Sequence, residues 1–181
     1  MRWKKTLTLR RSSNADYTLI FDSSSLIVLN ELKFLDLFVS RIEKQSSINI
    51  VIPTTVLDEI SKGGLTINSH SIQIINSYSD DLASIPENLG NGEKGVIILA
   101  ESLKNTTSVI AITDDKKARG ICEKRGITVM GTLGLIEFLK KHKILFREEA
   151  IDMLKRIPGT SLYITQSLLD EANNKFLTQI I

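Results

Sequence analysis

Short runs of β-branched and other apolar residues alternate along this chain with longer stretches in which apolar residues recur every three or four positions. The short runs are residues 17–21, 48–52, 108–113 and 127–130, and the longer stretches are residues 23–38, 53–62, 90–104 and 115–126. The short runs predict buried strands, and the longer stretches predict amphipathic helices. Because strands that alternate with helices form parallel sheets covered on both faces, we predict an α/β fold with a mainly parallel sheet of four to five strands.

Residues that begin or end helices support these boundaries. Serines follow Asp22 at the start of the first helix, Pro53 occupies the first position of the second, and Gly126 stops the fourth. Residues 65–86 are ambiguous, because the isoleucines there are compatible with a short helix, a strand or both. Three closing helices are predicted at residues 132–145, 147–159 and 165–176.

Composition limits the classes of protein to which the chain can belong. Its 181 residues and 42% hydrophobic content suit one domain with a single core. The 23 lysines and arginines and 21 acids give a net charge of +2. This overall charge indicates neither a nucleic-acid partner nor a membrane partner. Cys122 is the single cysteine, so an internal disulfide is excluded, a structural zinc site is disfavoured and a reducing compartment is expected.

The N-terminal region differs from the rest of the sequence in charge. Lysines and arginines precede the first acid, Asp16, so we interpret residues 1–16 as a basic extension and residues 17–181 as one domain. The extension lacks the apolar centre of a signal peptide, and no apolar run approaches the roughly 18–20 residues of a membrane span. We therefore expect a soluble cytoplasmic protein with no membrane partner.

Several acidic residues lie where predicted strands give way to helices. Asp22 directly follows the first strand, and the adjacent Asp114 and Asp115 follow the third. Since ligands of open parallel sheets collect beyond the carboxyl ends of the strands, these acids are expected to face one cleft. Glu59 and Glu93 lie in early turns of helices, from which their carboxylates can be directed into the same cleft.

Carboxylates gathered at one point repel each other, so a cation is expected among them. Two bare charges ~4 Å apart cost about 4 kcal/mol at an effective dielectric of about 20. All-oxygen ligands favour Mg²⁺ or Mn²⁺, and such ions suit phosphoryl chemistry because they lower the pKa of an attacking water. The sequence therefore predicts hydrolysis of a phosphodiester. Taken singly, each acid is also compatible with a helix cap, a turn or a solvated helix position.

Four ordered segments carry a resemblance to a known family. They are IFDSSSLIVLNELKFLDLF, VIPTTVLDEI, LGNGEKGVIILA and AITDDKKARGICEKRGITVMGTLGLIEFLKKHKIL. Together they resemble a PIN domain of the DUF3368 branch, related to the VapC-type toxins of toxin–antitoxin pairs, from about residue 18 to about residue 176. The resemblance implies a three-layer α/β/α sandwich and a metal-dependent endoribonuclease. It further implies RNA as the substrate, a toxin role with a cognate antitoxin protein as partner, and a homodimer.

The resemblance also assigns roles to individual residues. The family's metal-holding and catalytic acids map onto Asp22, Glu59, Glu93 and Asp115. Asp114 is expected to share the role of Asp115 or to orient it. Supporting hydroxyl groups near the metal, Mg²⁺ or Mn²⁺, map onto Ser24 and Thr113.

Three cations follow the acid pair at the start of the fourth helix. They are Lys116, Lys117 and Arg119. At the rim of the cleft they can neutralise RNA phosphates, and a solvated helix face explains them equally well.

Two other interpretations differ in class from a nuclease. A catalytically silent PIN-like module would keep RNA or protein binding without turnover. A phosphatase or a response-regulator receiver is disfavoured, because the first strand ends in DSSS rather than D-x-D and no receiver-type lysine follows a late strand.

Overall fold

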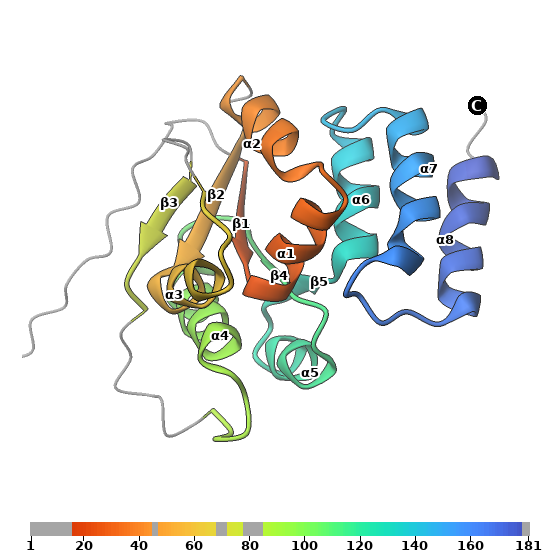
Figure 1. Ribbon diagram of the computed structural model, residues 1–181. Coiled ribbons are helices and arrows are strands. Elements are labelled where there is room, and N and C mark those ends of the chain that lie inside the picture. The colour runs from red at the N-terminus through yellow and green to blue at the C-terminus, as the bar shows by residue number, and fades with distance from the viewer. Residues whose placement is uncertain (1–15, 45–46, 68–71, 78–84, 179–181) are drawn as a thin grey trace, which may run out of the picture.

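A parallel sheet of five strands forms the centre of the computed structural model, which describes residues 16–44, 47–67, 72–77 and 85–178 (Figure 1). The strands are β1 (Tyr17–Phe21), β2 (Ile48–Pro53), β3 (Ile72–Ile75), β4 (Val109–Ile112) and β5 (Thr128–Met130). Their order is β3-β2-β1-β4-β5, and every pairing is parallel. The predicted α/β class and the parallel sheet are confirmed. Of the expected basic extension, only Asp16 falls within the described residues.

Helices cover both faces of this sheet. They are α1 (Ser23–Glu31), α2 (Leu35–Glu43), α3 (Thr54–Lys62), α4 (Asn91–Leu103), α5 (Lys116–Lys124), α6 (Thr132–Lys141), α7 (Arg147–Arg156) and α8 (Gln166–Thr178), with a short 3₁₀ helix η2 (Ile157–Gly159). Helix α4 packs against β1, β2 and β4, between α3 and α5. Among the described residues, every helix is too short or too polar to cross a lipid bilayer.

The opposite face of β1 is covered by α2 and α6. Tyr17 and Phe21 point to the same side of β1 because side chains alternate along a strand. The Phe21 ring lies 5.7 Å from the Phe38 ring of α2, and the Tyr17 ring lies 5.2 Å from the Phe138 ring of α6. Buried residues on both sides of the sheet thus form the three-layer α/β/α arrangement that the resemblance implies.

The structure departs from the predicted elements at several boundaries, and α6, for example, ends at Lys141 rather than at residue 145. The single helix predicted over residues 23–38 is two helices, because Lys33 adopts a left-handed conformation with φ of 54° and ends the first. This turn lets Phe34 and Phe38 enter the core. Pro53 ends strand β2 and precedes α3 instead of occupying its first turn. The ambiguous region 65–86 contributes the edge strand β3.

The chain order creates one position where the strand sequence reverses. The chain proceeds outward from β1 to β2 and β3, and then returns through α4 to β4 on the other side of β1. Phe21 and Ile112, the last residues of β1 and β4, are therefore direct neighbours. A reversal of this kind opens a crevice beyond the carboxyl ends of the two strands, where open α/β sheets bind ligands.

Candidate active site

Asp22 is a buried carboxylate at the end of β1, with 1% of its surface exposed. It caps α1: the backbone N–H of Ser25 donates to Oδ1 at 2.8 Å, and the Ser24 hydroxyl donates to Oδ2 at 3.0 Å. Burial raises the pKa of this carboxyl because desolvation disfavours its charged form, and hydrogen bonds from Thr113, Ser25 and Ser24 only oppose the shift. Asp22 is thus a site where a cation would be bound favourably.

Thr113 connects Asp22 with Asp115, the acid expected at the end of β4. The Thr113 side chain is fully buried and hydrogen-bonds to Asp22, while its Oγ1 accepts from the backbone N–H of Asp115 at 3.3 Å. Asp115 caps α5 by accepting from the N–H of Ala118 at 2.7 Å through Oδ1. The two predicted strand-end acids are therefore brought to the same edge with one hydroxyl between them.

Glu59 on α3 reaches toward the same edge. Ser23, the residue after Asp22, donates its hydroxyl to Glu59 Oε2 at 2.6 Å, and the backbone N–H of Gly92 donates to Oε1 at 2.8 Å. Glu59 thereby serves as a cap for α4, in whose first turn Glu93 lies. Hydrogen bonds thus run from the end of β1 to the start of α4.

Two glycines make this approach possible. A Cβ atom at Gly92 would collide with the carboxylate of Glu59, and one at Gly90 would collide with the carboxylate of Glu93. A side chain at either position would therefore push the flexible end of the neighbouring glutamate away from the backbone. The sequence pattern of glycines around Glu93 therefore has a steric reason in the structure.

Asp114 has a different environment from its neighbour Asp115. Its Oδ1 accepts from the backbone N–H of Thr132 at 2.9 Å, and its Oδ2 accepts from the Thr132 hydroxyl at 2.5 Å. Both carboxylate oxygens are therefore used to join the end of β4 to the start of α6. Asp115 differs because only its Oδ1 accepts the hydrogen bond that caps α5. Among the described residues, no hydrogen bond holds its Oδ2.

The acids share one structural feature, which is that each one lies at the N-terminus of a helix. Asp22, Glu59, Asp115 and Asp114 accept from the first backbone N–H groups of α1, α4, α5 and α6 respectively. Helix N-termini carry partial positive charge, which offsets the repulsion between gathered carboxylates. Across the described ranges, no three Asp, Glu, His or Cys side chains stand grouped as metal ligands. The donor set, carboxylate and hydroxyl oxygens, is nevertheless the one that Mg²⁺ and Mn²⁺ prefer.

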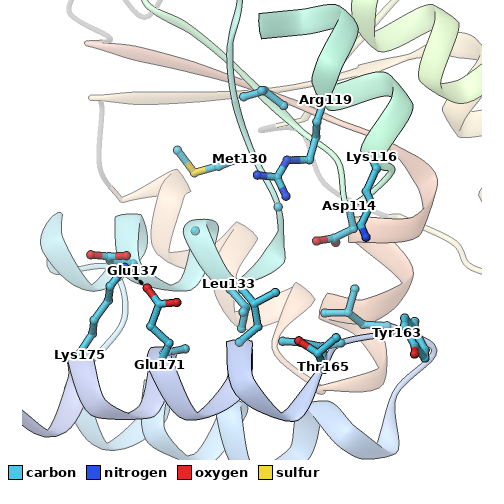
Figure 2. Close-up of a pocket in the computed structure, with 17 residues that line it drawn as sticks. Asp114, Lys116, Arg119, Met130, Leu133, Glu137, Tyr163, Thr165, Glu171 and Lys175 are labelled. Atoms are coloured by element: carbon cyan, nitrogen blue, oxygen red, sulfur yellow. Dashed lines mark ion pairs between the residues drawn. The ribbon is translucent and has the colours of Figure 1, made fainter.

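The three predicted RNA-binding cations occupy the first turn of α5. Lys116 and Lys117 are exposed and Arg119 is partly buried. Lys116 and Arg119 line a pocket together with Asp114, as Figure 2 shows, whereas Lys117 does not line it. The structure thus separates one of the three cations from the other two.

Some residues that hold the acids at this edge are not predicted from the sequence. Ser23 and Thr132 hold Glu59 and Asp114 by hydroxyl groups, and the Gly92 backbone N–H holds Glu59. The serine run after Asp22 and the threonine in GTLG were visible, but only the fold shows which acid each hydroxyl meets. A serine directly beside a candidate acid is the signal that was available for Ser23.

A comparison with protein families matches residues 18–177 to the DUF3368 family model, described as a PIN domain. The match covers all five strands and the eight α-helices almost to the last residue. No curated protein matches the chain significantly.

Proposed function

The chain belongs to the DUF3368 branch of the PIN domain family, a nuclease-like fold, and on this basis we propose that it is a metal-dependent endoribonuclease. The observation that carries the proposal is Asp22, a buried carboxylate surrounded by neutral hydrogen-bond donors and joined through Thr113 to Asp115. Burial of a carboxylate without a cation costs free energy, and functional sites are where such costs concentrate.

The metal would be Mg²⁺ or Mn²⁺, held by the four predicted acids Asp22, Glu59, Glu93 and Asp115. A bound divalent ion would supply positive charge for the phosphate and a water acidic enough to attack it. The hydroxyls of Ser23, Ser24 and Thr113 would orient the carboxylates. Asp114 fits an orienting role better than a direct one, since both its oxygens are engaged by Thr132.

The test is cleavage of a structured RNA pool with Mn²⁺ by the wild type and by Asp22→Asn. Asn keeps the cap of α1, because Asn and Asp are comparable caps, so the fold should persist. We expect the variant to lose at least about 100-fold in cleavage rate, since even residues that only orient metal ligands are worth roughly 10- to 100-fold. Equal cleavage by both proteins would exclude this mechanism.

The biological role that we propose is that of a VapC-like toxin with a cognate antitoxin protein, working in the cytoplasm as a homodimer. It rests on the sequence resemblance of the four segments, and it treats residues 17–181 as one nuclease domain after a basic extension. Expression should arrest bacterial growth, and expression of a small neighbouring gene with a DNA-binding motif should relieve the arrest. Sedimentation of the purified chain tests the dimer.

One observation favours a second candidate, a catalytically silent PIN-like module that binds RNA or protein. In the part of the chain that the structure describes, the acids accept hydrogen bonds from hydroxyl and backbone N–H donors, and no three of them form a ready metal group. Calorimetric titration with Mn²⁺ separates the candidates. Binding that Asp22→Asn abolishes supports the nuclease, and absence of binding at millimolar ion supports the module.

A further inference from the structure

A pocket of about 350 Å³ lies beside the candidate active site, between α5, β5, α6 and α8 (Figure 2). It begins at Asp114 and extends along α6 to the middle of α8. Its volume falls within the roughly 300–1,000 Å³ of pockets that hold small ligands. Of the residues to which the proposed nuclease chemistry gives a role, only Asp114 lines this space.

The two ends of the pocket carry different charges. Lys116 and Arg119 stand at the end nearest Asp114, and neither forms an ion pair anywhere in the described residues. Glu137 and Glu171 stand at the other end, where Lys175 lies 3.5 Å from Glu171. The pocket is therefore polarised: at the end beside the active site two cations outnumber the single carboxylate of Asp114, and at the other end acids outnumber the one cation.

Between these ends the wall is apolar, and an exposed aromatic residue stands at one of them. Leu133 and Met130 lie between the charged ends, and Leu168 of α8 contributes to the wall with about half of its surface exposed. Tyr163 lines the pocket at the end that holds Asp114 and Lys116, as Figure 2 shows, and 92% of its surface is exposed. An aromatic ring left in solvent next to an apolar wall offers a stacking surface to a flat ligand.

We propose that this pocket, defined by Lys116, Arg119, Leu133, Tyr163 and Glu137, binds an unstacked segment of the RNA substrate next to the cleavage site. The cations take a phosphate and Tyr163 stacks on the base beside them, while Glu137, at the opposite end, accepts a hydrogen bond from an exocyclic amine of the adjoining base. The inference rests on the proposed function, because it takes the polymer that enters the active site to be RNA.

The polarity of the pocket favours a nucleotide over an apolar protein segment. A short RNA segment presents negative phosphates and neutral rings with amine donors, which suit the cationic end and the acidic end respectively. A helix laid in the groove would bury unpaired Lys116, Arg119 and Glu137 against apolar side chains, at a high desolvation cost. Continuity with Asp114 places the nucleotide on the path of a strand leaving the active site.

The experiment measures the affinity of the full chain for fluorescein-labelled oligo(A), oligo(C) and oligo(U) RNA in EDTA, where cleavage cannot occur. Tyr163→Ala should weaken binding by roughly 5-fold to 100-fold, the range found for base–aromatic stacking. Tyr163→Phe keeps the ring and should bind as the wild type does. Lys116→Ala with Arg119→Ala should reduce the salt dependence, by about one unit of slope for each lost phosphate contact.

Specificity gives an independent outcome. Adenine and cytosine carry an exocyclic amine and uracil does not, so oligo(A) and oligo(C) should bind several-fold more tightly than oligo(U), and Glu137→Ala should remove the difference. The controls are Phe146→Ala, which removes another exposed aromatic ring outside the pocket, and Lys124→Ala at the far end of α5. Both should bind all three RNAs as the wild type does.

The inference and the proposed function fail in different ways. If Asp22→Asn abolishes cleavage but Tyr163→Ala binds RNA like the wild type, the nucleotide pocket is wrong and the nuclease stands. The groove would then be open to a protein segment. If Tyr163→Ala weakens binding but the wild type cleaves nothing with Mn²⁺, the pocket stands and the nuclease is wrong. Equal losses for Tyr163→Ala and Phe146→Ala would also overturn the pocket.

Discussion

Two acids of the molecule have opposite electrostatic environments. Glu149 lies at the joint between α2 and α7, and Asp22 lies at the carboxyl edge of the sheet. At the joint, Glu149 faces Arg41 through two hydrogen bonds of 2.7 Å, and this pairing lowers the pKa of the Glu149 carboxyl. At the edge, Asp22 is buried among neutral donors, and burial raises its pKa. Among the described residues, Glu149 is matched by a cation and Asp22 is not.

This difference separates a structural acid from one that folding alone does not explain. Arg41 also donates to the carbonyl of Ile144 at 2.7 Å and lies 5.0 Å from the ring centre of Phe146, so Glu149 belongs to a contact that fastens two helices. Asp22 gains hydrogen bonds from the neutral donors Ser24, Ser25 and Thr113 and the partial charge of a helix N-terminus. An external cation would complete the edge, whereas the joint is complete without one.

The largest expected difference concerns activity. Asp115→Asn should lower RNA cleavage by at least about 100-fold, while Glu149→Gln should leave the rate unchanged because the joint is remote from the edge. Asn retains the cap of α5, so the loss would reflect the charge. Cleavage rates at saturating Mn²⁺, with circular dichroism as a check of folding, decide the matter. Equal rates for the two variants would remove the distinction between edge and joint.

Mn²⁺ should raise the free energy of unfolding by binding at the carboxyl edge of the sheet and not at the joint. If Mn²⁺ binds, the wild type gains about 2.7 kcal/mol at one hundred times the dissociation constant, and Glu149→Gln gains as much. Asp22→Asn should gain much less, since it removes a ligand. Thermal unfolding with Mn²⁺ or EDTA measures these gains. A Mn²⁺ effect of the same size in Asp22→Asn would place the ion elsewhere.

The sequence was sufficient for four of the five strands, all but the edge strand β3, because strand signals are local. Runs such as YTLIF and INIVI are β-branched or aromatic and end at residues with turn or cap chemistry, so strands β1 and β2 were predicted closely. The break at Lys33 was not predictable, because a left-handed residue other than glycine is imposed by the burial of Phe34 and Phe38 rather than by its own preference. Tertiary packing decided that boundary.

The acids were predictable by position, but their partners were not. Asp22 and Asp115 could be placed at one edge from the strand–helix alternation alone, because parallel strands share a carboxyl end. That Asp114 is held by Thr132, eighteen positions later in the chain, depends on how α6 meets β4. Capping and function were weighed as alternatives, yet Asp22 and Asp115 are caps in the structure, and this is compatible with the metal role proposed for them.

A smaller effect is expected at the joint. Glu149→Gln should lower the free energy of unfolding by about 1 kcal/mol, because the pair is partly exposed and Gln can still accept from the Phe146 N–H. Asp152→Asn breaks the more exposed Arg156–Asp152 pair and should cost less than about 0.5 kcal/mol. Urea unfolding at neutral pH measures both. Equal costs would mean that the bidentate geometry contributes nothing.

The smallest effect reverses sign between the two regions. The raised pKa of Asp22 means that its contribution to stability is full below 3.8, the ordinary aspartate value, and is lost as pH rises through the pKa of the folded protein. The lowered pKa of Glu149 means that its contribution is full above 4.5, the ordinary glutamate value, and is lost as pH falls through the folded pKa.

In EDTA at neutral pH, Asp22→Asn should therefore be slightly more stable than the wild type, by less than about 1 kcal/mol, since the start of α1 already offsets part of the charge. Urea unfolding of both variants and the wild type across the acid range would test this, because the Asp22→Asn advantage should grow with pH while the Glu149→Gln deficit also grows. An advantage of Asp22→Asn that stayed constant with pH would show that Asp22 does not titrate on unfolding, and the contrast between the two carboxylates would then lie in packing rather than in charge.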